Sequence, residues 1–517
     1  MTEKAIESSQ DNATVLVQGK SSDLIQTTKH FEEGQVNEDI DATKHNLAVL
    51  NQTIESLGFG KYQWKMFFTC GFGFLVDQML VVSVGLVIPQ ITKQWDVKYP
   101  SMLIASLYAG ALVGALLCGF LLDTIGRKLV WQNSLFVVTI FTLIAASSPN
   151  FTALAIFIGL QCVGAGGNIA IDITVFTESI PQAKGYMLTA LTMWWGIGNA
   201  VGGFLAWPLI THFSCPEAAT PDMCSNHDNM GWRYQYILIG GLTFLMAVIR
   251  VFCMKMEESP KWLVTQGRYE DALAVLTEIS KANQRDLQII SNDFLQLRYD
   301  HRADATVSRA VHVRGLFSTR ILARSTFGLI VLWMCIGIAY PIYTLFLPIY
   351  LANNGANLGT GSTFNTYRDY SISSTVGIFG PLFSAILVNT PILGRRCSMA
   401  ITALCAAAFA GAFTSVRSEA SNIAFSSLLG FWQNAFYAIL YSYTPEVLPT
   451  AHRGTGCGLT LALGRVASLS SPFIATFSDL NTSAPIWVCL GLYVVIAITA
   501  VSLPYEPKRF QKDMYIS

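Results

Sequence analysis

Long apolar stretches separated by short polar loops form the main pattern of this chain. Twelve of them are long enough to cross a bilayer, and each can satisfy its backbone hydrogen bonds there only as a helix. They lie near residues 65–90, 101–122, 129–147, 152–176, 186–211, 233–253, 322–351, 370–389, 397–416, 422–444, 454–478 and 484–503. A charged stretch near 254–320 divides them into two sets of six. The pattern therefore predicts an all-α membrane protein with twelve transmembrane helices in two six-helix bundles.

The composition agrees with this class and excludes several others. Of 517 residues, 52% are hydrophobic and only 13% are charged, against about 25% charged in soluble domains. Lys plus Arg (33) equal Asp plus Glu (33), so no basic field indicates nucleic-acid binding. The chain contains no Walker loop, no zinc-type spacing of His and no nucleophile beside an evident base. We therefore expect no cofactor, no metal site and no enzymatic activity.

Lys and Arg near the ends of the apolar stretches predict the orientation of the chain. The loops after even-numbered stretches are rich in them, whereas the opposite loops contain few, such as Arg368. Both termini are therefore expected in the cytosol. The expected parts are a cytosolic tail (1–63), a first bundle (64–253), a cytosolic central loop (254–320), a second bundle (321–503) and a cytosolic tail (504–517). The plasma membrane is the expected location, with an intracellular vesicle or vacuole membrane as the alternative.

An internal repeat links the two sets of apolar stretches. Two different motifs recur with the same offset of 268 residues. The pairs are Gly126-Arg127 with Gly394-Arg395, and Glu178 and Pro181 with Glu446 and Pro449. Such a repeat predicts duplicated six-helix halves, as in transporters built from parallel repeats.

The loop between the second and third stretches contains a specific motif. It runs from Gly119 through Asp123 and Gly126 to Arg127 and Lys128. The glycines allow close helix approach and a tight turn, Asp123 can cap and pair, and the cations favour the cytosolic face. This motif resembles the signature loop of the major facilitator superfamily. The resemblance implies that salt bridges of this loop lock a cytosolic gate in the outward-facing state.

Further segments narrow the resemblance. Residues 257–263 (EESPKWL) and 446–454, from Glu446 to Arg453 and Gly454, resemble markers of sugar-porter-like members. The tract 166–172 (GGNIAID) with Trp194-Trp195 resembles fungal relatives of the synaptic-vesicle two-related protein branch. The resemblance covers roughly residues 58–505 and implies a solute carrier without naming the solute. The sugar-porter ending is altered at 504–507 (PYEP), which argues against a hexose.

Charged residues in the middle of the apolar stretches are candidates for function. Asp77, Asp172 and Arg465 are the ones found there, and a charge at the bilayer centre costs at least about 2.5–3.5 kcal/mol. None of the three recurs at the 268-residue offset, whereas the gate motifs do. Symmetry of the scaffold therefore does not explain them, which favours a functional role.

The sequence leaves the roles of these residues open. Related transporters use a carboxylate in the first span for proton coupling or substrate binding, but Asp77 could equally be a structural acceptor between helices. Asp172 lies about one turn from the cytosolic end and belongs either to a gate network or to the binding site. Arg465 either pairs with Asp77 or binds the carboxylate of an anionic substrate, for which a planar guanidinium is well shaped.

Amide and aromatic side chains on single helix faces complete a candidate cavity. These are Asn168, Trp195, Asn199, Tyr340, Gln433, Asn434 and Tyr437. Aromatic residues in membrane helices more often pack or anchor at the interface than bind ligands, so each alone is a weak indication. Together they indicate a substrate with a planar or apolar body and hydrogen-bonding groups.

Two cysteines lie in the longest expected external loop of the first half. Cys215 and Cys224 are separated by eight residues that include two prolines. Outside the cytosol the surroundings are oxidising, so the two either form a disulfide or remain free thiols.

These observations favour a monomeric secondary transporter of a small organic solute that works by alternating access. Proton coupling is expected because Asp77 and Asp172 are titratable, and uptake and efflux stay equally open. An uncoupled facilitative carrier is the first alternative. A receptor or vesicle protein that kept the fold without transport is the second.

Overall fold

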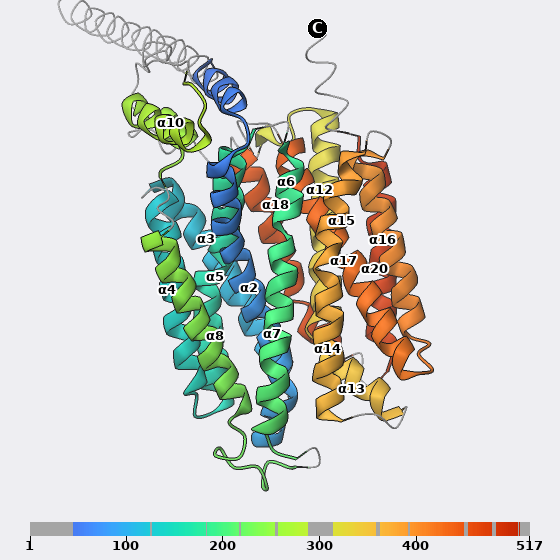
Figure 1. Ribbon diagram of the computed structural model, residues 1–517. Coiled ribbons are helices and arrows are strands. Elements are labelled where there is room, and N and C mark those ends of the chain that lie inside the picture. The colour runs from blue at the N-terminus through green and yellow to red at the C-terminus, as the bar shows by residue number, and fades with distance from the viewer. Residues whose placement is uncertain are drawn as a thin grey trace, which may run out of the picture. The chain divides into compact units, whose positions relative to one another are not determined.

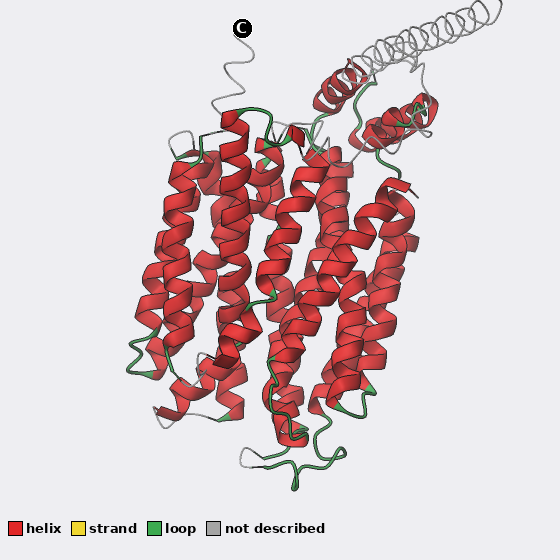
Figure 2. Cartoon of the chain, turned by 180° about the vertical axis from the view of Figure 1, so that it is seen from behind, coloured by secondary structure: helices red, strands yellow, loops and turns green. Residues whose placement is uncertain are grey.

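The computed structural model describes residues 45–124, 127–181, 184–216, 219–253, 257–287, 314–357, 362–390, 393–448, 453–477, 482–504 and 506. By contacts the chain divides into two compact units. One contains residues 1–58 and 258–307, and the other contains residues 59–257 and 308–517. The described parts of both units are helical, with short connecting loops (Figures 1 and 2).

The smaller unit contains a helix at 45–57, α9 (Pro260–Thr265) and α10 (Tyr269–Asn283). Leu50, Ile54 and Leu57 are buried on the first helix, as are Leu276 and Ile279 on α10. The Asn283 amide donates a hydrogen bond to the Leu57 carbonyl, at 3.4 Å. Amphipathic faces therefore hold these segments together across more than 200 residues of chain.

The larger unit contains two sets of transmembrane helices. The first set is α2 (Lys61–Gln94), α3 (Met102–Thr124), α4 (Arg127–Ala146), α5 (Phe151–Ser179), α6 (Tyr186–Leu191) with α7 (Met193–His212), and α8 (Gly231–Val248) with the π-helical turn η2 (Ile249–Cys253). The second set is α12 (Arg320–Thr344) with α13 (Leu347–Asn357), α14 (Thr363–Gly377) with α15 (Phe379–Asn389), α16 (Gly394–Phe413), α17 (Glu419–Val447), α18 (Arg453–Ser468) with α19 (Ser471–Phe477), and α20 (Ala484–Ser502).

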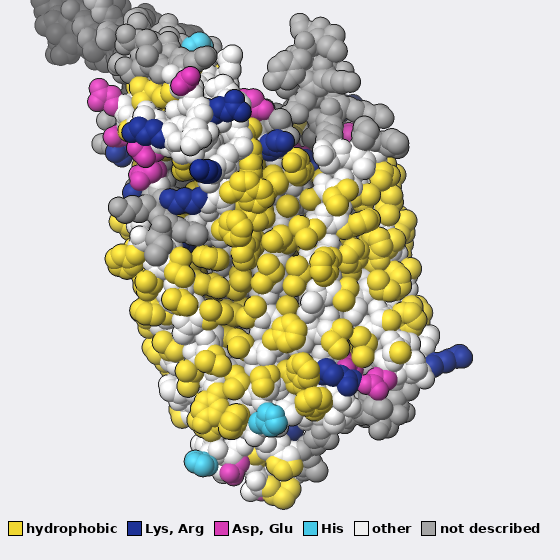
Figure 3. Space-filling model, in the orientation of Figure 1, with side chains coloured by type: hydrophobic (Ala, Val, Ile, Leu, Met, Phe, Trp, Pro, Cys, Tyr) yellow, Lys and Arg dark blue, Asp and Glu magenta, His cyan; other side chains and the backbone are white. Residues whose placement is uncertain are grey.

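Ten of these helices or joined pairs are long and apolar enough to cross a membrane. The helices α3 and α7 complete six in each half, which confirms the expected fold class. Hydrophobic side chains cover the middle of the larger unit in Figure 3. Leu116, Ile386 and Phe477 are each more than 60% exposed, as expected of side chains that face lipid.

Polar residues at helix starts fix several boundaries. Asn150, Thr319, Ser362 and Ser418 each accept a hydrogen bond from a backbone N–H of the first turn, in α5, α12, α14 and α17 respectively. These caps satisfy donors that the helix itself leaves free.

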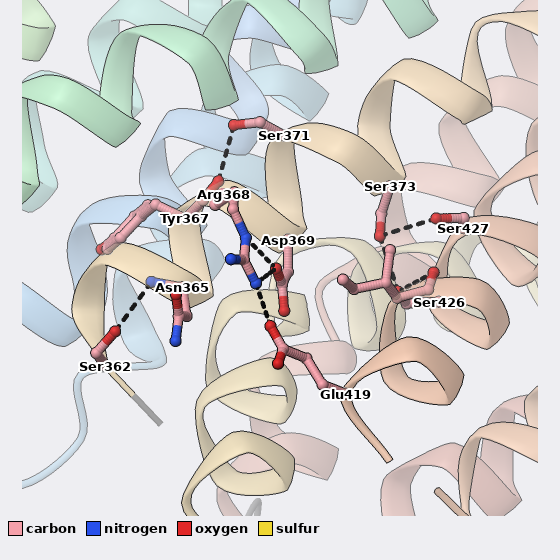
Figure 4. A network of polar contacts seen from close by, with 11 residues as sticks. Ser362, Asn365, Tyr367, Arg368, Asp369, Ser371, Ser373, Glu419, Ser426 and Ser427 are labelled. Carbon is pink, nitrogen blue, oxygen red and sulfur yellow. Dashed lines mark hydrogen bonds and ion pairs between the residues drawn. The ribbon is translucent and has the colours of Figure 1, made fainter. Parts of the chain in front are cut away.

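The helix α14 departs from the sequence-based expectation. We expected the eighth span to begin near residue 370, with Arg368 in a loop, but the helix begins at Thr363. Arg368 lies between Asp369 and Glu419, with its guanidinium 2.8 Å from Asp369 Oδ1 (Figure 4). Because the charge is neutralised and Ser362 caps the helix, a polar first turn is stable here.

Glycines allow the closest approaches between helices. A Cβ placed on Gly110 of α3 would lie 2.0 Å from the Gly159 carbonyl oxygen of α5. A Cβ on Gly85 of α2 would lie 2.3 Å from the Leu345 carbonyl oxygen, which belongs to the second half. Backbone therefore touches backbone both inside a half and between the halves.

The larger unit has two ends, called the Arg395 end and the Cys215 end after residues that lie there. At the Arg395 end, α2, α12 and α16 begin (Figure 1). At the Cys215 end, α2 ends and the loop after α7 contains a disulfide between Cys215 and Cys224.

Candidate functional site: a closed cavity between the halves

A small cavity lies between the two halves. It is lined from both halves, by α2, α3 and α7 on one side and α12, α17 and α18 on the other. Its walls include Asp77, Trp195, Tyr340, Tyr437 and Arg465, all of which the sequence singled out. Residues far apart in the chain are thus brought to one place by the packing of the halves.

Aromatic rings form one wall of this cavity. The Trp195 ring centroid lies 5.0 Å from that of Tyr437 and 6.2 Å from that of Tyr340, with the latter pair nearly parallel. The Tyr340 and Tyr437 centroids are 5.2 Å apart. Trp195 belongs to the first half and both tyrosines to the second. A planar ligand would find ring faces and edges on both sides.

The two charged residues of the cavity come from opposite halves. Asp77 on α2 is 4% exposed and accepts a hydrogen bond from Trp195 Nε1 at 3.4 Å. Arg465 on α18 has no ion pair of 4.0 Å or less with Asp77 or with any other carboxylate among the described residues. The cavity therefore presents an acidic and a basic group that do not neutralise each other by direct contact.

Three polar lining residues were not predicted from the sequence as site residues. Gln78 Nε2 donates a hydrogen bond to the Tyr340 hydroxyl at 2.6 Å, which links α2 to α12. Tyr108 on α3 and Ser468 on α18 also line the cavity. Gln78 could have been predicted as a cavity residue, because it is polar and follows Asp77 in an apolar stretch. For Tyr108 and Ser468 the sequence offers no indication beyond the residue type.

The predicted amides lie in a second pocket rather than in the charged cavity. Asn199, Gln433 and Asn434 line it together with the tyrosine and hydroxyl side chains of Tyr343, Thr344, Ser373, Ser374 and Ser426. Asn199 Oδ1 accepts from the Tyr370 hydroxyl at 2.7 Å. Gln433 donates to Thr344 Oγ1 at 2.9 Å and accepts from Tyr493. These amides have partners within the protein.

Asp172 and Asn168 lie away from both pockets, inside the first half. Asp172 is fully buried and paired with Arg250 of η2, and Trp131 Nε1 donates to the same carboxylate oxygen at 2.7 Å. Asn168 Oδ1 accepts from Arg250 at 2.8 Å. Sequence reasoning missed Arg250 as a partner because it lies at the end of its apolar stretch, 78 residues from Asp172.

Ion pairs occupy the Arg395 end. Both Arg395 Nε and a terminal guanidinium nitrogen donate to Glu446, one to each carboxylate oxygen. The backbone N–H of Arg395 donates to Glu506 at 2.8 Å, so the altered tail motif also serves this cluster. In the first half, Lys128 Nζ lies 3.4 Å from Glu257. Glu178 is half-buried near the end of α5.

The rest of the expected gate motif lies outside what the structure describes. This holds for Gly126 and for the side chains of Asp123, Arg127 and Arg453, as well as for the surroundings of Gly119. Their role in a gate remains a prediction from the resemblance.

Both ends of the cavity are bridged between the halves. Towards the Arg395 end, Thr189 of α6 donates to Ser442 of α17 at 2.8 Å. Towards the Cys215 end, the Tyr367 hydroxyl of α14 donates to the Leu86 carbonyl of α2 at 2.6 Å. Tyr367 is close to the ionic cluster of Arg368 in Figure 4. The structure thus has contacts that close the cavity on both sides.

Comparisons with known proteins agree with this architecture. The family model described as "Major Facilitator Superfamily" matches residues 67–472. MFS siderochrome iron transporter 1 of Ceriporiopsis subvermispora is 37% identical over 491 residues, covering 92% of this chain and 93% of that protein. Niacin transporter NiaP of Acinetobacter baylyi is 26% identical, covering 82% and 89%.

Two more distant similarities concern the branch and the fold. Synaptic vesicle 2-related protein of Xenopus laevis is 24% identical, covering 89% of this chain and 81% of that protein. A partially occluded, inward-open structure of the xylose transporter XylE from E. coli has a TM-score of 0.65 and 15% identity, covering 86% and 99%. The resemblance seen in the sequence motifs is thereby confirmed.

Proposed function

The chain belongs to the Major Facilitator Superfamily, and from this premise we propose that it is a proton-coupled carrier of a small organic anion with a planar body. It is an integral, multi-pass membrane transporter of a small solute, and not an enzyme. We further propose that it works as a monomer, with both termini in the cytosol of a cell whose plasma membrane it spans. The gradients set whether it takes up or exports its solute.

The observation that supports this proposal is the guanidinium of Arg465. It has no ion-pair partner among the described residues and lies in a closed cavity walled by aromatic rings. Its planar fork matches a carboxylate in two parallel hydrogen bonds. Trp195 and Tyr437 supply ring surfaces for an apolar or planar body next to it. A monocarboxylate on a small ring fits both features.

In this closed state the cavity has room for about one water molecule, so a solute enters only when the halves separate. The name of the niacin transporter among the relatives agrees with such a substrate, because niacin is a ring with one carboxyl group. We therefore choose nicotinate as the probe, and its uncharged amide, nicotinamide, as the matched control.

Asp77 is the group that we propose for proton coupling. It lies in the same cavity as Arg465 but on the other half, so an anionic Asp77 repels the substrate carboxylate that Arg465 binds. Protonation of Asp77 removes this repulsion, so proton and anion bind together. Alternating access follows when the halves rock about their glycine contacts and break one bridge at a time.

The test uses purified full-length protein in liposomes with an imposed pH gradient. We expect nicotinate, but not nicotinamide, to accumulate when the outside is acidic and to exchange when no gradient is present. Exchange that ignores pH would indicate the uncoupled carrier. No binding or movement of any aromatic acid would contradict the proposed substrate class, and no movement of any solute would favour a receptor.

A further inference from the structure

A buried ion pair in the first half has one unused oxygen. Asp172 Oδ1 accepts from both Arg250 and Trp131, and the side chains of Asp172 and Arg250 have no exposed surface. Asp172 Oδ2, in contrast, is completely buried and has no hydrogen-bond partner in the described part of the chain. A buried carboxylate oxygen without a donor is unfavourable unless a proton or a water can reach it.

This oxygen faces α2 at a glycine. A Cβ placed on Gly73 would lie 1.7 Å from Asp172 Oδ2, so no other residue fits there without displacing the carboxylate. Asp77 is four residues further along α2, on the same face and about 6 Å away along the axis. The free oxygen of Asp172 and the side chain of Asp77 thus lie about one helical turn apart along the same face of α2.

The charged and titratable groups around Asp172 are few in the described part of the chain. Arg250 on η2 and Asp77 on α2 are the charged ones, and Cys70 on α2 adds a thiol. The partner from α4 is the neutral indole of Trp131. Apart from Arg250, the charged group that α2 brings within about one turn of Asp172 is thus Asp77, the carboxyl that lines the cavity.

We propose that Asp172 is a second proton acceptor, which receives through its free Oδ2 the proton that Asp77 takes up in the cavity. The inference rests on the proposed proton coupling at Asp77. In the transfer the Asp77 carboxylic acid loses its proton and becomes a carboxylate, and Asp172 becomes the carboxylic acid. Arg250 keeps its proton throughout, so the total charge of the three groups does not change.

The transfer has a mechanical consequence at the Arg395 end. A neutral Asp172 can still accept a hydrogen bond from Arg250 at Oδ1 but no longer forms an ion pair with it, so η2 is held less firmly to α5. Glu257 follows Arg250 by only seven residues and pairs with Lys128 at the start of α4. Protonation of Asp172 thereby loosens this end of the first half and links the proton to the rocking movement.

The first experiment does not depend on a substrate. Infrared difference spectra of the full-length protein in lipid nanodiscs are recorded between pH 8 and pH 4.5. We expect a protonated-carboxyl band that disappears in Asp172→Asn and remains in Asp369→Asn. Asp369 is the matched control, because it is also buried and paired with an arginine, but in the other half. An unchanged band in Asp172→Asn would overturn the proposal.

The second experiment separates the relay from folding. Because Asp172→Asn leaves Arg250 unpaired, the neutral double variant Asp172→Asn with Arg250→Gln is also made. We expect it to keep nicotinate exchange within about two-fold, and to lose at least ten-fold of the acid-driven accumulation. The relay would be overturned if the double variant accumulated nicotinate as wild type does while Asp77→Asn still lost coupling. If wild type shows no acid-driven accumulation, the proposed function fails, and the infrared band decides on Asp172.

Discussion

At the scale of single residues, buried charges differ in whether the protein neutralises them. Arg250 with Asp172, and Arg395 with Glu446, form direct ion pairs. Arg465 has no such partner in the described structure, although a charge in the membrane is costly. A paired charge is stabilised without a ligand, whereas a lone cation in a cavity is stabilised when an anion binds. The proposed substrate class therefore rests on Arg465.

The first prediction concerns the shape of the Arg465 side chain. Arg465→Lys keeps the charge but loses the planar fork, so we expect nicotinate affinity to fall at least ten-fold, about 1.4 kcal/mol. Arg465→Gln should fall further. Isothermal titration on the purified protein measures both, with Ser468→Ala in the same cavity as the control. Unchanged affinity with a lower melting temperature alone would make Arg465 structural.

A second prediction concerns Asp77. Asp77→Asn retains the hydrogen-bond acceptor for Trp195 but cannot take up a proton. We expect acid-driven accumulation of nicotinate to disappear while exchange persists and becomes independent of pH between 5 and 8. Flux measurements in liposomes across this range are the check. Accumulation that survives in the variant would place coupling elsewhere.

At the scale of elements, apolar length predicted the helices and local chemistry changed their ends. The early start of α14 was missed because its neutralising partner, Glu419, lies about 50 residues away on α17. The polar face of the fourth span was recognised, but not its contact with Arg250. Cavity residues with charge or aromatic rings were predictable, since such groups are costly in lipid. Tyr108 was not, because only the packing of the halves brings it there.

The third prediction concerns the contact of α2 with the second half. Gly85→Ala places a Cβ against the Leu345 carbonyl, where 2.3 Å leaves no room, so the halves cannot close as they do here. We expect transport to fall at least ten-fold, with nicotinate still bound. The matched control is Gly241→Ala on α8, where an added Cβ meets nothing within 4 Å. Equal transport by the two variants would show that this contact is not needed for closure.

At the scale of the whole molecule, the parts that recur in both halves and the parts that do not recur have different proposed roles. The glycine, arginine and glutamate motifs recur in both halves, and in the second half they form the Arg395–Glu446 pair. Asp77 and Arg465 have no counterparts at the repeat offset and meet only where the halves face each other. We therefore propose that the symmetric scaffold moves, while the asymmetric cavity selects the solute and the ion.

The last prediction tests which end of the larger unit faces the cytosol. Cations concentrate at the Arg395 end, and the disulfide of Cys215 and Cys224 lies at the other end, where an oxidising exterior would favour it. A single cysteine is introduced as Ser483→Cys, in the loop before α20, or as Ser280→Cys on α10. The exposed native Cys397 is replaced by serine in both variants.

In intact cells an impermeant maleimide should label Ser483→Cys at once and Ser280→Cys only after permeabilisation. The expected difference follows from the charge rule, because cationic loops are retained in the cytosol while loops with few cations cross the membrane. Labelling of both only after permeabilisation would place the carrier in an internal membrane. The reverse order of labelling would place the Arg395 end outside, and the acid side of the proposed proton gradient would then have to drive export.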